Sequence, residues 1–120
     1  MHELGITRNV VSIVCEHAGT RPVKRVTLDI GKLSGIDARA IAFCFDVVAK
    51  GTGVEGASLV INEIDGMGVC NVCESAFPMP TLITPCPCGS RDTRRTAGEE
   101  LKVREFEYAE VPEMAQSQAI

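Results

Sequence analysis

Residues 67–98, MGVCNVCESAFPMPTLITPCPCGSRDTRRTAG, decide how this 120-residue chain is organised. They contain four of its six cysteines and four of its six prolines, without the periodic apolar pattern of a packed core. A segment of this composition cannot bury enough apolar surface to offset the entropy lost when it becomes ordered. It therefore needs a cross-link, which its cysteines can supply, and we predict a metal-held insert in a larger domain.

The four cysteines of the insert form two pairs. Cys70 and Cys73 make a CxxC pair, and Cys86 and Cys88 make a CxC pair after twelve intervening residues. Two such pairs suit the closed tetrahedral site of structural zinc, which leaves no position open for a substrate. Zinc bound in this way can contribute on the order of 10–16 kcal/mol to the folding of a small segment. We predict a structural zinc site.

The short second pair leaves other interpretations open. These are a disulfide, a rubredoxin-like iron site, or a site completed by a carboxylate such as Glu74 or Asp92. The remaining cysteines, Cys15 and Cys44, fall on apolar helix faces, where free cysteine is commonly a small buried hydrophobe. No targeting signal is recognisable, and clustered cysteines in a reducing compartment more often bind metal than form disulfides, so we expect a cytoplasmic protein.

The amino-terminal part of the chain predicts a helix followed by a strand. Residues 4–18 have the periodicity of an amphipathic helix that ends at Gly19. Its expected apolar face consists of Leu4, Val11, Val14, Cys15 and Ala18. Residues 23–30 alternate between apolar and polar side chains, as a half-buried strand does.

A second helix and two further strands are expected. The helix runs from Asp37, whose carboxylate can cap the first amides, to about Lys50. Its predicted apolar stripe consists of Ile36, Ala40, Phe43, Cys44, Val47 and Val48. Residues 57–64 form a strand that is apolar on both faces and therefore central. Residues 100–108 form another, whose apolar alternation slips between Val103 and Phe106, as at a β-bulge.

Composition excludes several functions. A net charge of −4 and only 4% aromatic residues, with no tryptophan, argue against nucleic-acid binding. No stretch approaches the ~18 apolar residues of a membrane span. The chain has two histidines, no Ser/His/Asp set and no phosphate-binding glycine loop, so we expect no enzymatic activity.

The first residues form a candidate nickel site. The α-amine of Met1, the deprotonated amide of His2 and its imidazole can close adjacent chelate rings around one metal ion. Nickel(II) suits such tetragonal nitrogen sites, although copper(II) would bind them more tightly. Elsewhere in a chain, a lone histidine is more often structural.

Four motifs resemble those of the HypA/HybF nickel-incorporation family, over roughly residues 1–110. They are the Met1-His2-Glu3-Leu4 start, the IGKLSGI run at residues 30–36, the AFCFD run at residues 42–46 with Lys50-Gly51-Thr52 and Glu55-Gly56, and the cysteine pairs with Gly89-Ser90. The chain departs from the family's CPxCGS pattern by one residue, at Cys86-Pro87-Cys88.

The resemblance implies an α+β fold with two parts. A small mixed three-stranded sheet with two helices, residues 1–66 and 99–112, would form the nickel-binding domain. A zinc-ribbon-like loop domain, residues 67–98, would be inserted before the last strand, and residues 113–120 would form a flexible tail.

The resemblance also implies a metallochaperone for [NiFe]-hydrogenase maturation that is not an enzyme. Nickel would bind transiently at His2, with Met1 and Glu3 beside it, and zinc would be held by the four cysteines. The partners would be the GTPase HypB and the hydrogenase large subunit, and homo-oligomerisation is left open. Asp37 could be a further nickel ligand, although capping is the simpler role. The alternative is a zinc-ribbon module that binds a protein or nucleic acid and has no nickel role.

Overall fold

The computed structural model describes residues 2–110. Met1 and the tail predicted over residues 113–120 lie outside the described residues. Neither helix in the described range is long and apolar enough to cross a membrane.

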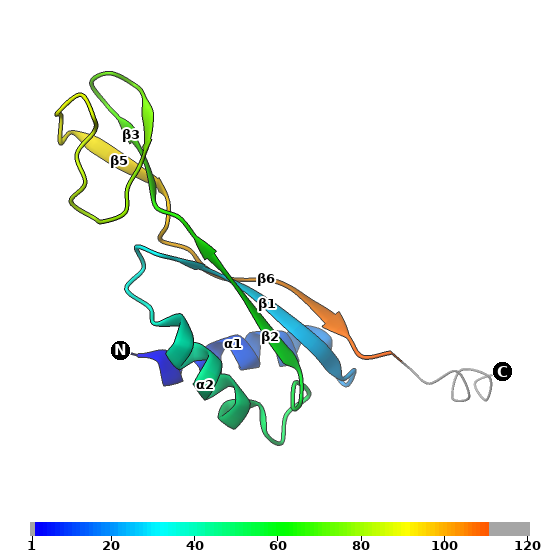
Figure 1. Ribbon diagram of the computed structural model, residues 1–120. Helices are drawn as coiled ribbons and strands as arrows, with labels where there is room; N and C mark the ends of the chain where they lie inside the picture. Colours follow the sequence, from blue (N-terminus) through cyan, green and yellow to red (C-terminus); the bar gives the residue numbers. More distant parts are fainter. Residues whose placement is uncertain (1, 111–120) are drawn as a thin grey trace.

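The described chain has two helices and six strands arranged in two sheets (Figure 1). In chain order they are α1 (Glu3–Ala18), β1 (Val23–Gly31), α2 (Ala38–Ala49), β2 (Ser58–Ile64), β3 (Met67–Cys70), β4 (Ala76–Pro78), β5 (Thr93–Ala97) and β6 (Leu101–Tyr108). The larger sheet has the order β2-β1-β6, and the smaller sheet, built from the inserted segment, has the order β4-β3-β5. The predicted α+β class is confirmed.

Both helices cover the same face of the larger sheet (Figure 1), and the main core lies between them and the sheet. The buried face of α1 consists of Glu3, Thr7, Val10, Val11, Val14 and Ala18. The prediction was wrong for Leu4, which is 45% exposed. Helix α1 ends at Gly19, as expected, with a φ of +65° that glycine adopts without strain.

Asp37 caps α2 as predicted, because its Oδ1 atom accepts hydrogen bonds from the amides of Arg39 (2.9 Å) and Ala40 (3.4 Å). The predicted apolar stripe was wrong for Phe43 and Val47, whereas Ile36 and Val48 pack against the main core. The helix buries Ile41, Phe45 and Ala49, while Phe43 is 76% exposed and Val47 is 55% exposed. The helix is apolar nearly all round, so its sequence does not fix which side meets the sheet.

Strand β1 is the centre of the larger sheet, paired in parallel with β2 and antiparallel with β6. The prediction that residues 57–64 form the central strand was therefore wrong. Leu59 and Ile61 of β2 pack on the core, but Val60 points away and is 39% exposed. Strand β2 pairs only with β1 and is therefore an edge strand of the larger sheet. Its apolar residues Leu59 and Ile61 are explained by contact with the core under the helices.

The predicted β-bulge lies in β6. Val103 and Glu105 are opposite consecutive residues of β1, Leu28 and Thr27, so Arg104 is the extra residue. Its side chain reaches across the outer face of the sheet to the carboxylate of Asp29.

A tight junction connects the larger sheet to the insert. Leu33, from the loop after β1, packs in the insert's small core with Phe77 and Met79. Its amide donates to the carbonyl of Gly98 over 2.7 Å. A Cβ atom at Gly31 would lie 1.9 Å from the Gly98 carbonyl oxygen, so only glycine fits at this crossing.

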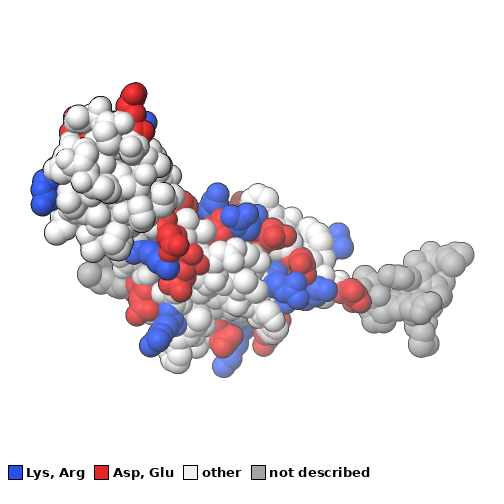
Figure 2. Space-filling model, turned by 45° about the horizontal axis from the view of Figure 1, so that its top comes forward, with Lys and Arg blue, Asp and Glu red and all other residues white. Residues whose placement is uncertain are grey.

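Charged side chains are unevenly distributed on the face shown in Figure 2. Acidic and basic groups are intermixed over the larger part of the molecule, while most of the inserted part is uncharged. No large basic surface is visible on this face.

Candidate metal centre

The insert brings the four cysteines together from two turns. Cys70 ends β3, and the chain then turns back so that the amide of Glu74 donates to the Cys70 carbonyl over 2.9 Å. In the second turn, the amide of Gly89 donates to the Cys86 carbonyl over 2.8 Å, and Gly89 has a φ of +95°. Both turns are folded by their own backbone hydrogen bonds.

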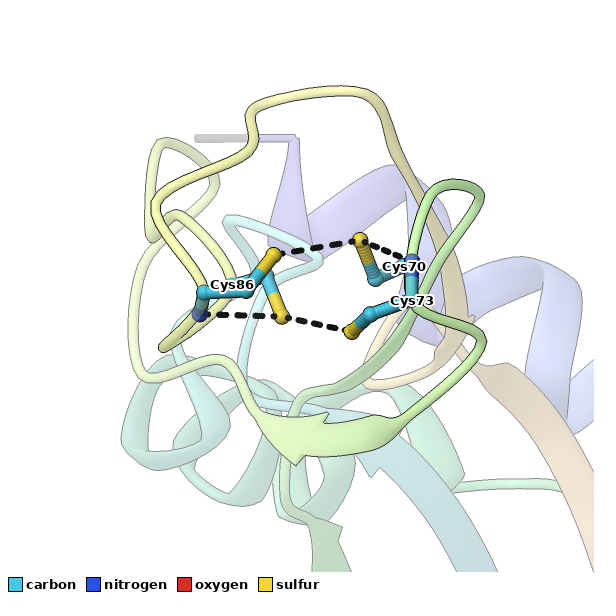
Figure 3. Close-up of side chains that lie close together, drawn as sticks. Cys70, Cys73 and Cys86 are labelled. Atoms are coloured by element: carbon cyan, nitrogen blue, oxygen red, sulfur yellow. Dashed lines mark hydrogen bonds between the residues drawn. The ribbon is translucent and has the colours of Figure 1, made fainter.

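The four sulfur atoms face one another (Figure 3). The Sγ atoms of Cys70 and Cys88 are 3.8 Å apart, those of Cys73 and Cys86 are 3.6 Å apart, and all four lie within 4.8 Å of one another. Zinc with four sulfur ligands at about 2.3 Å in a tetrahedron requires sulfur–sulfur separations of about 3.8 Å. The cluster therefore has the dimensions of a zinc site.

Backbone amides support the two pairs unequally. The Cys70 sulfur accepts from the amides of Val72 and Cys73, both at 3.4 Å. The Cys86 sulfur accepts from one amide, that of Cys88, at 3.5 Å. The first cysteine of the shortened CxC pair thus accepts one N–H···S hydrogen bond where the first cysteine of the CxxC pair accepts two.

The clustered thiols differ widely in pKa: that of Cys73 is lowered and that of Cys86 is raised. Hydrogen bonds from the hydroxyl and amide of Ser75 lower the pKa of Cys73 to about 6. The amide of Cys88 lowers the pKa of Cys86, but burial and the neighbouring sulfur atoms outweigh it and raise that pKa to about 12. Four thiolates so close together repel one another, so full ionisation of the cluster requires a cation.

Two of the alternative interpretations are disfavoured. A disulfide has sulfur atoms about 2.05 Å apart, whereas the cysteines here are free. Among the described residues, only the four cysteines form a group of three or more metal-binding side chains, so neither Glu74 nor Asp92 joins the cluster. The carboxylate of Asp92 instead accepts from the side-chain amide of Asn71 over 3.0 Å.

The amino-terminal candidates lie at the start of α1. His2 is exposed and directly precedes the helix, and Met1 lies outside the described residues. Glu3 is 8% exposed, and its Oε2 atom accepts from the amide of Asp37 over 3.1 Å. The amino terminus of the chain and this amide lower the pKa of Glu3 to about 2. The side chains of His2, Glu3 and Asp37 are not close enough to count as a three-ligand group.

The sequence analysis missed two groups of polar residues. One is Ser75, which follows the CxxC pair and lowers the pKa of Cys73. The other is centred on Asp29, which is 1% exposed and accepts from Arg104 and Asn62. The sequence contains no clear signal for Asp29, because its alternation with the buried residues Leu28 and Ile30 is that of an ordinary polar residue on the outer face of the strand.

A family model described as hydrogenase/urease nickel incorporation, metallochaperone, hypA matches residues 1–108. The chain belongs to the HypA family. The resemblance to HypA/HybF proteins seen in its motifs is confirmed.

The sequences of individual relatives can be aligned with this chain over nearly their full lengths. The hydrogenase maturation factor HypA of a Nostoc species is 48% identical over 111 residues, covering 92% of this chain and 98% of the relative. That of Geobacter sulfurreducens is 46% identical over 108 residues, covering 89% and 98%.

Two solved structures share the fold. A solution structure of a HypA protein has a TM-score of 0.68 and 24% identity, covering 91% of this chain and 97% of that one. The solution structure of the nickel metallochaperone HypA from Helicobacter pylori has a TM-score of 0.64 and 24% identity, covering 90% and 97%.

Proposed function

We propose that this chain is a nickel metallochaperone for the maturation of [NiFe]-hydrogenase. It would carry nickel(II) in the cytoplasm, work with the GTPase HypB, and deliver the ion to the hydrogenase large subunit. The observation that carries the proposal is the family match, which begins at the first residue and includes both the amino terminus and the cysteine insert. The reduced state required by four clustered thiols is consistent with action in the cytoplasm.

The proposed nickel site consists of Met1, His2 and Glu3. Since no three side chains converge around His2 in the described structure, we infer that backbone nitrogens supply part of the coordination. The α-amine of Met1 and the amide of His2 are suitably spaced for this in sequence, and nickel(II) accepts such a nitrogen set. Glu3 would lie beside the ion while its carboxylate holds the start of α1 against Asp37.

The two proposed metal sites differ in how readily they should exchange their ion. A terminal site with one imidazole is exposed, so it can take up and release its ion. The four cysteines enclose their site, and zinc there would supply structural cross-linking with no open position for a substrate. We therefore propose a carrier without catalytic activity, with residues 1–66 and 99–112 holding nickel and residues 67–98 holding zinc.

The zinc-ribbon alternative explains only the cysteines. It gives no role to the amino terminus or to the motifs of residues 30–56, all of which lie in the region matched by the family. The net charge of −4 and the intermixed surface charges also disfavour nucleic-acid binding (Figure 2).

An amino-terminal extension tests the nickel site. Adding Gly-Ser before Met1 keeps the imidazole of His2 but turns the α-amine into an amide. Nickel affinity, measured by calorimetric titration of untagged protein, should fall while zinc content stays the same. If the extended protein binds nickel as tightly as the natural one, the site does not use the amino terminus and the proposal is wrong.

A further inference from the structure

The four cysteines of the insert differ in how far solvent can reach them. Cys70 and Cys86 are buried, with exposed fractions of 0% and 3%, whereas Cys73 and Cys88 are exposed. Each of the two turns therefore contributes one buried and one exposed cysteine. An oxidant in solution can reach each turn through its exposed cysteine.

Each exposed cysteine faces a buried cysteine of the other turn. The Sγ atom of Cys88 lies 3.8 Å from that of Cys70, and the Sγ atom of Cys73 lies 3.6 Å from that of Cys86 (Figure 3). The sulfur atoms of a disulfide are about 2.05 Å apart. Each of these pairs would therefore have to approach by less than about 2 Å to become a disulfide.

The short second turn disfavours a disulfide between its own two cysteines. Only Pro87 separates Cys86 from Cys88, so a bond between their sulfur atoms would close a small ring around one residue. Proline fixes its own φ, which leaves this ring little freedom to reach the geometry that a disulfide requires. Both cysteines of this turn must therefore find partners in the other turn. The observed contacts select Cys70 for Cys88 and Cys73 for Cys86.

We propose that the insert is a site of reversible oxidation by hydroperoxides, at which these two cross-turn disulfides replace the zinc ion. The proposal rests on the structural zinc site proposed above. The thiolate, which is the form of cysteine that binds zinc, is also the form that attacks a hydroperoxide.

Each disulfide forms in two steps. The thiolate of the exposed cysteine attacks an oxygen atom of hydrogen peroxide, the O–O bond breaks, hydroxide leaves and the sulfur becomes a sulfenic acid. The thiolate of the buried cysteine then attacks this sulfur, so that the S–S bond forms, the S–O bond breaks and a second hydroxide leaves. Two thiolates thereby lose two electrons, hydrogen peroxide gains them, and both hydroxide ions take up protons to become water.

The first disulfide should be enough to release zinc. It leaves two thiolates, whereas a closed structural zinc site uses four ligands. The same two turns that zinc joined are then joined by a covalent bond, which restricts the unfolded chain. We therefore expect the oxidised insert to keep its small core of Leu33, Phe77 and Met79. A thiol reductant opens both disulfides by exchange, after which the cluster can bind zinc again.

Hydrogen peroxide added to dilute, zinc-loaded protein tests the release of zinc. The freed ion is measured with a chromogenic chelator. About two molecules of hydrogen peroxide per chain, one for each disulfide, should lower the bound zinc from about one ion per chain to near zero. Dithiothreitol followed by zinc should restore it. Cys44→Ala removes a thiol outside the cluster and should behave as the wild type does.

Glutamyl endopeptidase distinguishes the possible disulfides. After free thiols have been alkylated and the oxidised protein denatured, the enzyme cuts at Glu74, which lies between the two cysteine pairs. Cross-turn disulfides hold the fragments of residues 64–74 and 75–99 together until a reductant is added, whereas disulfides within a turn let them separate. Stepwise reduction with differential alkylation then shows which cysteines are joined.

The outcomes separate this proposal from the zinc site on which it rests. Reversible zinc release, with Cys70 joined to Cys88 and Cys73 joined to Cys86, supports it. Zinc that stays bound in excess hydrogen peroxide, fragments that separate, or the other cross-turn pairing would overturn the proposal and leave the zinc site intact. Reduced protein that binds no zinc would contradict the zinc site, and this proposal with it.

Discussion

The carboxylate of Glu3 accepts a hydrogen bond from the backbone N–H of Asp37 over 3.1 Å. Glu3 lies in the first turn of α1, and Asp37 is the N-cap of α2. Each carboxylate lies at a helix amino terminus, where the helix dipole favours negative charge. This contact holds the starts of the two helices together and thereby fixes the position from which His2 extends.

Replacing Glu3 with glutamine should make stability less dependent on pH. The variant keeps an oxygen that can accept from Asp37 but loses the charge. The amino terminus and the Asp37 amide lower the pKa of Glu3 from 4.5 to about 2. The carboxylate therefore contributes stability above its unfolded pKa, and this contribution is lost as the pH falls towards 2.

Thermal unfolding measured across this pH range checks that prediction. The wild type should melt at a higher temperature than Glu3→Gln at pH 7, and the difference should close in acid. Equal melting temperatures at neutral pH would show that the charge of Glu3 does not stabilise the fold.

Cys73→Ala should remove zinc and unfold the insert. Three sulfur atoms cannot close the tetrahedral site, and β3, β4 and β5 share only a small core. The zinc content, measured by metal analysis, should fall from about one ion per chain to near zero. The NMR signals of the backbone amides in the larger sheet should remain unchanged. Cys44→Ala, on α2 and outside the cluster, is the control and should retain zinc. Full zinc content in Cys73→Ala contradicts the assignment.

Asp29→Asn should destabilise the larger sheet near neutral pH. Hydrogen bonds from Arg104, together with Asn62, hold the pKa of Asp29 below its usual value despite its burial. The stabilisation is present above the unfolded pKa of Asp29 and is lost as the pH falls through the lowered folded value. The melting temperature should drop by several degrees at pH 7 and converge with that of the wild type in acid. Asp46→Asn, at an exposed position of α2, should have little effect, and an equal loss in both variants would exclude a special role for Asp29.

Leu33→Ala should loosen the junction between the larger sheet and the insert. Leu33 is 9% exposed and packs against Phe77 and Met79, so truncation should cost about 2–4 kcal/mol in chemical unfolding of the zinc-loaded protein. Leu82→Ala removes the same atoms from a side chain that is 52% exposed and should change stability by less than about 0.5 kcal/mol. Similar losses in both variants would mean that Leu33 does not couple the two parts.

Features that depend on the type and spacing of a few residues could be predicted from the sequence. The capping role of Asp37, the end of α1 at Gly19 and the clustering of the cysteines follow from residue type and spacing. The bulge in β6 was visible because one apolar position is displaced between Val103 and Phe106.

Features set by tertiary packing were not predictable. Nearly every residue of α2 is apolar, so periodicity could not show that Phe45 faces the core and Phe43 faces solvent. Strand order depends on contacts between distant segments, and the apolar middle of β2 was misread as a central position. The small sheet within the insert also escaped prediction, because its strands are three to five residues long.

Calorimetric titration of nickel(II) into untagged, zinc-loaded protein tests the nickel-carrier proposal most directly. Three proteins should be compared: the wild type, His2→Ala, and His17→Ala as a matched control. His17 is the chain's other histidine, and its Nδ1 atom lies 2.9 Å from the carbonyl oxygen of Ile13 near the end of α1. The wild type and His17→Ala should each bind about one nickel ion per chain with equal affinity, and His2→Ala should lose this binding while keeping its zinc and fold. Unchanged nickel stoichiometry and affinity in His2→Ala would contradict the proposed nickel site.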